Sequence, residues 1–247
     1  MTIIESSSET VAPSSNRSRS LVVMAKAPKP GMVKTRLAQN IPVEAVTELY
    51  RCLLDDTMAL AQSLGGVEVA MMCPASDVDD LARLAGDAVP VVAQTGDGLA
   101  AGLTSVFAHF ISAATGQQRV IAFNSDSPHL PASVLERAFE VLATCDVVVG
   151  PTHDGGYYLV GAKATHPGLF NGDGMGTSNA LETLLERVRA LGLSVRLVDA
   201  FYDIDVASDL SRLTVELRLA PERAPRTAAW LEEWRQATAL PAGPGSL

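Results

Sequence analysis

The sequence predicts a three-layer α/β/α protein, in which helices cover both faces of a mostly parallel sheet. Short apolar runs of strand length alternate along the chain with longer segments that carry apolar residues at helical spacing, and this alternation is typical of parallel sheets. The chain has 247 residues, of which 47% are hydrophobic. A chain of this length and composition can bury the core of one large domain.

Each strand is expected where an apolar run stops at Gly, Pro or polar residues, and each helix where apolar residues recur on one face. The expected strands cover residues 21–25, 67–73, 89–93, 119–125, 146–150, 157–161 and 193–198. The expected helices cover residues 42–64, 77–84, 99–114, 131–143, 177–191 and 207–217. A further short helix is expected over residues 32–38. In the helix over residues 42–64, Asp55 and Asp56 are expected on the solvated face.

The two ends of the chain differ from this core. Residues 1–19 are rich in Ser and other polar groups and are expected to be disordered. The domain is then expected to cover residues 20–219, and residues 220–247 to form a helical extension with a flexible end. In that extension, Trp230 and Trp234 are expected to dock on the body of the domain or on the partner subunit of a homodimer.

The charge balance restricts the partners. The 28 acidic and 19 basic residues give a net charge of −9, which argues against binding to nucleic acid or to a membrane surface. No apolar run approaches the length that spans a bilayer, and the N-terminus lacks the apolar core of a signal peptide. The three cysteines have no metal-binding spacing. A cytoplasmic protein with a small anionic ligand is expected.

A basic loop follows the first expected strand. It contains two prolines, a glycine and four cations, which are Lys26, Lys29, Lys34 and Arg36. Loop N–H groups and a helix N-terminus point partial positive charge at a ligand, so this loop can act as a phosphate cradle; a solvated basic loop is the alternative. The segment is not a Walker A loop, because it lacks both the glycine directly before the lysine and the earlier glycine of G-x-x-x-x-G-K-[ST].

Three carboxylates are candidates for metal binding. Asp126 follows the central strand, and ligands of open α/β sheets bind at the carboxyl ends of strands. It either caps the helix that starts near residue 131 or holds a divalent cation against a phosphate. Asp203 and Asp205 alternate, so on extended backbone they share a face and repel unless a cation lies between them or one turns to solvent. The alternative is that Asp205 or Ser208 caps the last core helix.

Two further loops are candidates for ligand contact. Gly96 and Gly98 flank Asp97, and such glycines allow close backbone approach to a ligand or serve only as a turn. The segment His153-Asp154-Gly155-Gly156 lies between two expected strands, where it forms a simple hairpin or meets a bound substrate. His153 can act as a base there, although a lone loop histidine is more often only solvated.

Four segments, in this order, carry a resemblance to a known family: MAKAPKPGMVKTRLA, NSDSPHLP, GPTHDGGYYLVG and YDIDVASDL. Over residues 20–217 the chain resembles a bacterial family of the DUF2064 type. That family is described as glycosyltransferase-like or by its similarity to 2-phospholactate guanylyltransferases, within the GT-A nucleotide-diphospho-sugar transferase superfamily. The resemblance implies a Rossmann-like sheet of the GT-A nucleotidyltransferase type.

The resemblance also implies roles for individual residues. Lys34 and Arg36 would hold the nucleotide phosphates and, with Asp126, form the catalytic set; Asp126 and Asp205 would bind Mg²⁺ or Mn²⁺. The implied nucleotide-binding residues are Ala25, Lys26, Gly31, Lys34, Arg36, Gly96, Asp97 and Gly98. The implied acceptor-binding residues are His153, Asp154, Gly155 and Gly156.

This sequence departs from the family pattern at two places. The usual D-x-D-T-P reads Asp203-Ile-Asp205-Val-Ala207, and Asn124 stands where a glycosyltransferase D-x-D would begin. The second departure favours nucleotidyl transfer from a nucleoside triphosphate to a small phosphorylated or phosphonate acceptor, with release of pyrophosphate. Glycosyl transfer from an NDP-sugar and non-catalytic nucleotide binding are the two alternatives.

Overall fold

A seven-stranded sheet forms the centre of the molecule, with strand order β3-β2-β1-β4-β6-β5-β7. The computed structural model describes residues 19–111, 118–171, 174 and 178–239. The strands are β1 (Arg19–Met24), β2 (Glu68–Cys73), β3 (Val91–Ala93), β4 (Arg119–Asn124), β5 (Val147–Pro151), β6 (Tyr157–Ala162) and β7 (Val195–Leu197). Within the described chain, β6 alone runs antiparallel to its neighbours. The predicted mostly parallel sheet is therefore confirmed.

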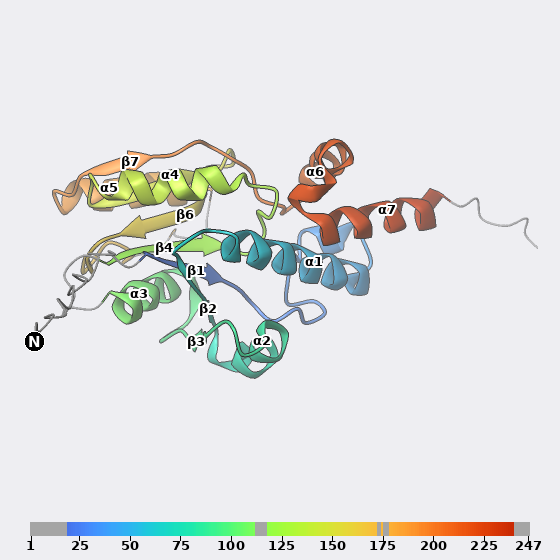
Figure 1. Cartoon of the computed structure of the whole chain (residues 1–247), viewed down its shortest axis with the longest axis horizontal. Helices are drawn as coiled ribbons and strands as arrows, with labels where there is room; N and C mark the ends of the chain where they lie inside the picture. The colour runs from blue at the N-terminus through green and yellow to red at the C-terminus, as the bar shows by residue number, and fades with distance from the viewer. Residues whose placement is uncertain (1–18, 112–117, 172–173, 175–177, 240–247) are drawn as a thin grey trace, which may run out of the picture.

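Helices cover both faces of this sheet, as the alternation predicted (Figure 1). They are α1 (Val43–Gln62), α2 (Val78–Ala85), α3 (Gly98–Phe110), α4 (Ala132–Leu142), α5 (Ala180–Ala190), α6 (Ala207–Leu219) and α7 (Pro225–Ala239). Short 3-10 turns occur at η1 (Leu37–Gln39), η2 (Ala75–Asp77) and η3 (Pro221–Arg223). None of the helices described is both long and apolar enough to cross a bilayer.

Alternation along β1 explains the layers. Leu21 and Val23 point into a core shared with α1, α2 and α4, whereas Val22 points into a core shared with α3 and α5. All three side chains are fully buried. Because successive strand residues face opposite sides, an apolar strand of this kind requires cover on both faces.

A third core cluster lies where α1 meets the C-terminal helices. Leu49 and Leu53 of α1 pack there with Leu213 of α6 and Leu231 of α7. Figure 1 shows α6 and α7 beyond the strand ends, with α7 alongside α1. Trp230 packs against this cluster, and its ring stacks on that of Trp234 with centroids 5.5 Å apart.

Asp56 corrects one expectation about α1. Its side chain is not solvated but 3% exposed, and its carboxylate accepts the backbone N–H groups of Arg226 (3.2 Å) and Thr227 (2.7 Å) at the start of α7. Asp55 is half-buried and pairs with Arg226 at 2.9 Å. The carboxylate of Asp56 is thus used to fix α7, because the first N–H groups of a helix have no partner within the helix.

Most predicted elements lie within a few residues of their observed bounds. β1 starts at Arg19, two residues earlier than expected, and the rest of the predicted disordered tail lies outside the described residues. The predicted ends at residues 112–114 and 177 and the tail at 240–247 also lie outside them. The helix expected over residues 32–38 is wrong: the segment forms turns up to η1.

The register of β1 with its two neighbours aligns the carboxyl ends of three strands. Met24 at the end of β1 lies beside Met72 of β2 and Asn124 of β4. The segments that follow these three strands therefore leave the sheet along one edge. That edge is the carboxyl edge of the parallel strands, where ligands of open α/β sheets bind.

Candidate functional site

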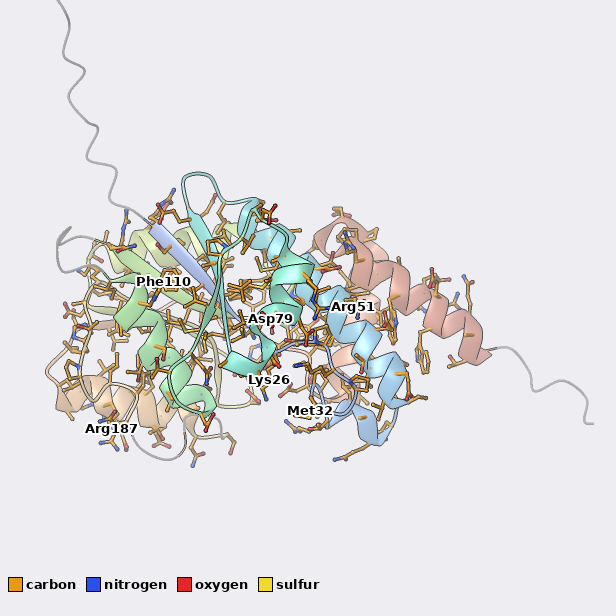
Figure 2. The ribbon with its side chains drawn as sticks, turned by 90° about the horizontal axis from the view of Figure 1, so that it is seen from below. Lys26, Met32, Arg51, Asp79, Phe110 and Arg187 are labelled. Atoms are coloured by element: carbon orange, nitrogen blue, oxygen red, sulfur yellow. The ribbon has the colours of Figure 1, made fainter. Side chains whose placement is uncertain are left out.

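A cleft of about 720 Å³ opens at this edge. It is lined by the loop after β1, the loop between β3 and α3, and the residues that follow β4. Lys26 and Met32 of the loop after β1 are labelled in Figure 2. The cleft brings together eight of the residues expected to form a site: Ala25, Lys26, Lys34, Arg36, Asp97, Gly98, Asp126 and Asp205.

The segment after β4 and the segment before α6 are joined directly. The Ile204 N–H donates to the Asp126 carbonyl at 3.3 Å. The Ser127 hydroxyl, which is fully buried, donates to the Tyr202 carbonyl at 3.4 Å. These contacts link positions more than seventy residues apart, and they explain why carboxylates from the two segments meet.

Three carboxylates converge here: Asp126, Asp203 and Asp205. One oxygen from each lies within 4.8 Å of the other two. Asp126 Oδ1 is buried and has no hydrogen-bond partner within the part of the chain described. Converging carboxylate oxygens with an unused buried acceptor suit a hard divalent cation. The family resemblance implied only Asp126 and Asp205 as ligands, whereas the alternation of Asp203 with Asp205 was the sequence signal that pointed to Asp203.

Neither helix cap considered for these carboxylates is formed. α4 begins after Pro131 with no side-chain cap, so Asp126 is left to face the cleft. At α6 the carboxylate of Asp209 accepts the N–H groups of Asp205 (3.0 Å) and Val206 (2.8 Å). Asp209 therefore fixes the turn that leads into α6, and the Asp205 side chain pairs with Lys34 instead.

Lys34 reaches into this carboxylate group from the loop after β1. Its Nζ donates to Asp126 Oδ2 and lies 2.7 Å from Asp205 Oδ1. The Lys34 side chain is only 6% exposed, whereas Arg36, 3.6 Å from Asp205 Oδ2, is 62% exposed. Lys34 has a φ of 47°, the one positive φ outside glycine among the described residues.

The charges shift the protonation equilibria of this group in opposite directions. Burial, followed by repulsion from Asp126 and Asp205, raises the pKa of Asp203 from 3.8 to about 7. Burial would also raise the pKa of Asp205, but the charge and hydrogen bond of Lys34 lower it below its ordinary value. Burial would lower the pKa of Lys34, yet its two carboxylate partners raise it. Lys34 and Asp205 are thus held ionised, and Asp203 titrates near neutrality.

The expected phosphate cradle is only partly present. No helix N-terminus forms in the loop after β1, because residues 30–36 make turns. Lys29 points away from the cleft and pairs with Asp77 at 2.7 Å and Asp80 at 2.9 Å. Gly31, at a φ of 74°, shapes a turn and is not among the cleft-lining residues. The exposed cations left at the cleft mouth are Lys26 and Arg36.

The loop around Asp97 reaches the cleft through Asp97 and Gly98, whereas Gly96 does not line it. Gly96 and Gly98 have φ values of 81° and 83°, a region that glycine occupies without strain. Gln94 braces this loop, because its Nε2 donates to the carbonyls of Gly96 (2.9 Å) and Gly98 (3.3 Å). No local pattern in the sequence indicated this role of Gln94.

The loop His153–Gly156 lies outside the cleft lining but next to the segment that carries Asp203. The exposed His153 donates its backbone N–H to the Phe201 carbonyl at 3.2 Å. Asp154 Oδ1 accepts the Thr152 hydroxyl (2.5 Å) and the Gly156 N–H (3.2 Å), which fixes the turn. The charge of Asp154 also contributes to the raised pKa of Asp203.

Gly155 is held tightly in this turn. Its φ is 90°, and a Cβ placed on it would lie 1.9 Å from the Ser178 carbonyl oxygen. The Leu181 N–H donates to the Gly155 carbonyl at 3.0 Å. The turn is therefore packed against the start of α5, and only glycine fits at this position.

Tyr50 of α1 is a cleft residue that sequence reasoning missed. Its hydroxyl accepts the Lys26 N–H at 3.1 Å and shares a hydrogen bond with the Ser125 hydroxyl at 3.0 Å. Tyr50 thereby ties the loop after β1 to the residue before Asp126. Helical periodicity placed Tyr50 in α1, but no local signal distinguished it from a core aromatic.

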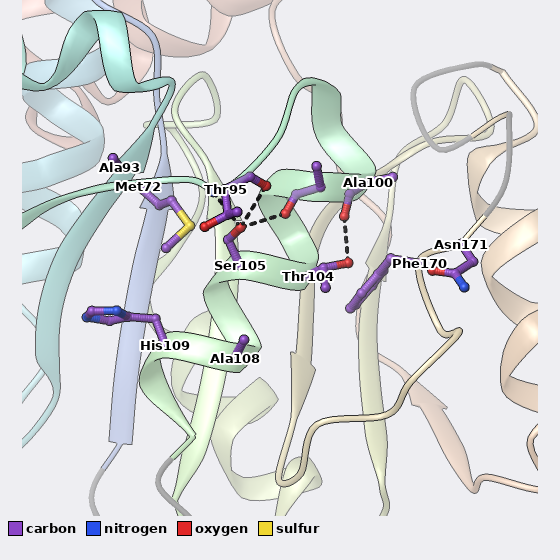
Figure 3. Close-up of a pocket in the computed structure, with 11 residues that line it drawn as sticks. Met72, Ala93, Thr95, Ala100, Thr104, Ser105, Ala108, His109, Phe170 and Asn171 are labelled. Atoms are coloured by element: carbon purple, nitrogen blue, oxygen red, sulfur yellow. Dashed lines mark hydrogen bonds between the residues drawn. The ribbon is translucent and has the colours of Figure 1, made fainter.

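A second pocket of about 730 Å³ adjoins the cleft beside α3 (Figure 3). Two of its hydroxyl groups are used within the chain: the Thr104 hydroxyl donates to the Ala100 carbonyl at 2.8 Å, and the Ser105 hydroxyl lies 2.8 Å from the Ala101 carbonyl and 3.3 Å from that of Thr95. The pocket contains none of the carboxylates or cations described above. Of these two pockets, the cleft is therefore the one that carries the converging charged side chains.

Comparison with known proteins agrees with this fold. Residues 57–177 match the family described as "Uncharacterized protein conserved in bacteria (DUF2064)", which confirms the resemblance noted in the sequence. No curated protein matches the chain in sequence.

Several solved structures are similar. A "putative nucleotide-diphospho-sugar transferase" from Desulfovibrio desulfuricans G20 is 26% identical, with a TM-score of 0.80 over 89% of this chain and 95% of that chain. A nucleotidyl transferase from Methanothermobacter thermautotroptrophicus is 21% identical, with a TM-score of 0.57 over 82% and 99%. The 4-diphosphocytidyl-2C-methyl-D-erythritol synthase from Anaerococcus prevotii is 10% identical, with a TM-score of 0.54 over 82% and 97%. The last two likenesses show a shared fold.

Proposed function

From the match to the DUF2064 family and the fold shared with nucleotide-diphospho-sugar transferases, we propose that this chain is a metal-dependent nucleotidyltransferase. It would join a nucleoside triphosphate to a small phosphorylated or phosphonate acceptor and release pyrophosphate. The observation that carries the proposal is that Asp126 and Asp205 meet Lys34 and Arg36 at one cleft, with a carboxylate oxygen of Asp203 close to those of Asp126 and Asp205. Such a set of carboxylates and cations fits the phosphates of a nucleotide and the metal that accompanies them.

The carboxylates fit a divalent cation such as Mg²⁺ or Mn²⁺. Asp126 and Asp205, with Asp203 added by the structure, offer three oxygens from two segments, and Asp126 Oδ1 has an unused acceptor site. Oxygen ligands are those that such hard ions prefer. When bound, the ion would offset the negative charge of the phosphoryl oxygens.

The residues of the chain would position the reactants. Lys26 and Arg36 lie exposed at the cleft mouth, where their charges can hold the triphosphate. The acceptor would approach from the side of Asp203 and the loop His153–Gly156. An oxygen of the acceptor phosphate would form a bond to the α-phosphorus, and the bond from that phosphorus to pyrophosphate would break. The acceptor oxygen is already ionised, so the reaction needs no protein base and depends on positioning and charge.

Glycosyl transfer from an NDP-sugar is the second candidate. The resemblance to the Desulfovibrio protein, which is named a "putative nucleotide-diphospho-sugar transferase", favours it. Against it stands Asn124, which occupies the first carboxylate position of a glycosyltransferase D-x-D and whose amide donates to Ser127 at 3.0 Å. An amide at this position removes one negative ligand, so nucleotidyl transfer remains the preferred proposal.

Calorimetric titration and a pyrophosphate-release assay test the proposal. ATP, GTP, CTP, UTP and UDP-glucose would be titrated with Mg²⁺ and with EDTA, and pyrophosphate measured with 2-phospholactate, phosphoenolpyruvate and methylphosphonate as trial acceptors. We expect one triphosphate to bind only with Mg²⁺ and to release pyrophosphate. Asp126→Asn should lower the rate at least a hundredfold, whereas Asp79→Asn on exposed α2 should leave it unchanged.

The other outcomes are distinct. Selective binding of UDP-glucose with release of UDP would support glycosyl transfer. Binding of a triphosphate that Asp126→Asn leaves intact, without turnover, would indicate a non-catalytic nucleotide-binding protein. Either result would overturn the nucleotidyltransferase proposal.

A further inference from the structure

Lys34 lies in the same place as the candidate metal-binding group. Its ammonium is hydrogen-bonded to Asp126 Oδ2 and to Asp205 Oδ1, the latter at 2.7 Å. These are oxygens of two of the three carboxylates that converge. The side chain is 6% exposed, so the ammonium is inside the group rather than at its edge.

The Lys34 ammonium neutralises carboxylate charge at the position where a metal ion would do so. It is a compact cation with three donors, and two of its hydrogen bonds are made to carboxylates on different segments. Asp126 and Asp205 carry two negative charges, and Lys34 with Arg36 carries two positive charges. A divalent cation that bound the same two carboxylates would face the positive charge of Lys34 at very short range.

The backbone of Lys34 adopts an unfavourable conformation at the residue whose side chain makes these ion pairs. Its φ of 47° lies in the left-handed region, which costs free energy for a residue with a side chain. The neighbouring Gly31, Met32, Thr35 and Arg36 are exposed, Met32 by 65%, so the loop has few packing contacts that would prevent a change. The buried side chain of Val33 anchors the loop beside Lys34. Release of the ammonium would allow the Lys34 backbone to relax.

We propose that Lys34 is a built-in counter-ion that closes the carboxylate group to free divalent cations. When a polyphosphate binds, its oxygens would pair with the Lys34 ammonium in place of the carboxylates. Asp126 and Asp205 would then be available to hold a divalent cation. Metal and triphosphate therefore bind together, each strengthening the other. This inference rests on the proposed function for the nature of the ligand, but it concerns binding and not turnover.

Binding of Mn²⁺ alone is the direct measurement. It would be followed calorimetrically at constant ionic strength and pH for wild type, Lys34→Met and Lys29→Met. Lys29 is the matched control, because it lies on the same loop but pairs with Asp77 and Asp80 outside the cleft. We expect Lys34→Met to bind Mn²⁺ at least tenfold more tightly than wild type, and Lys29→Met to match wild type. Equal affinity in Lys34→Met and wild type would overturn the inference.

A second measurement uses wild type only, and it decides the question if Lys34→Met fails to fold. Mn²⁺ affinity would be measured with and without inorganic tripolyphosphate, after correction for the complex that the two form in solution. We expect at least a tenfold gain in Mn²⁺ affinity, and the same gain in tripolyphosphate affinity when Mn²⁺ is present. Independent binding of the two ligands would overturn the inference.

The two proposals fail in different ways. Coupled binding of Mn²⁺ and tripolyphosphate without pyrophosphate release from any triphosphate would leave the role of Lys34 intact and refute nucleotidyl transfer. Pyrophosphate release by a protein whose Mn²⁺ affinity is the same with and without tripolyphosphate would support nucleotidyl transfer and refute the role of Lys34.

Discussion

Asp203→Asn should remove a pH dependence of stability that comes from the carboxylate group. The folded pKa of Asp203 is about 7, above its ordinary value of 3.8, because the side chain is buried beside Asp126 and Asp205. Between these two pH values the folded state keeps a proton that the unfolded state releases. The free energy of unfolding of the wild type therefore falls as pH rises from about 4 to about 7, in the absence of metal.

The size of this effect follows from the shift. A difference of roughly three pKa units at about 1.4 kcal/mol each gives an upper limit of about 4 kcal/mol. Solvent screening of the partly exposed group reduces this, so we expect Asp203→Asn to be about 2 kcal/mol more stable than wild type at pH 8.5. At pH 4 the two proteins should have nearly equal stability.

Urea denaturation at several pH values in EDTA, followed by the fluorescence of Trp230 and Trp234, measures the effect. Asp205→Asn is the matched control of opposite sign. Lys34 lowers the folded pKa of Asp205, so its charge stabilises the protein above pH 4 and its loss should reduce stability at pH 8.5. A parallel pH curve for Asp203→Asn and wild type would refute this reasoning, as would a less stable Asp203→Asn at pH 8.5.

Two further predictions concern packing. Asp56→Ala should lower the free energy of unfolding by about 2 kcal/mol, because it leaves the first N–H groups of α7 unpaired. Asp55→Ala, which removes a partly exposed ion pair with Arg226, should lower it by less than about 1 kcal/mol. Urea denaturation of the two variants measures the difference. Gly155→Ala should cost more than about 2 kcal/mol, because its Cβ would meet the Ser178 carbonyl oxygen, and thermal unfolding would show it. Gly168→Ala, at a similar φ of 91° but in open space, should cost only about 1 kcal/mol, and equal losses at the two glycines would contradict the packing argument.

The fold was largely predictable because its signals are local. The apolar runs of β1 and β4 and the helical spacing of α1 each lie within one stretch of sequence, and all three elements form close to their expected bounds. The position of Asp126 at the end of an apolar run was predictable for the same reason, and Asp205 was expected at the start of the last core helix. A strand that ends in polar residues delivers them to one edge of a parallel sheet.

The errors occur where distant residues decide a local outcome. The segment over residues 32–38 has a helical pattern, but Lys34 pairs with carboxylates 92 and 171 positions away and takes a positive φ instead. Asp56 looks solvated in the periodicity of α1, yet it fixes α7 from 171 positions away. Propensity and periodicity describe neighbours in sequence, so they carry no information on such contacts.

The sequence by itself determined the α/β fold, the end of the strands at which the candidate site lies, and the residue types present there. Only the tertiary structure decided that a carboxylate oxygen of Asp203 lies close to those of Asp126 and Asp205. It also decided which charges pair: Lys29 forms ion pairs with Asp77 and Asp80. Lys34, in contrast, lies between Asp126 and Asp205. The physical reason is that charges act through space. Whether a lysine faces a phosphate or a carboxylate depends on which charges folding places within a few ångströms of it.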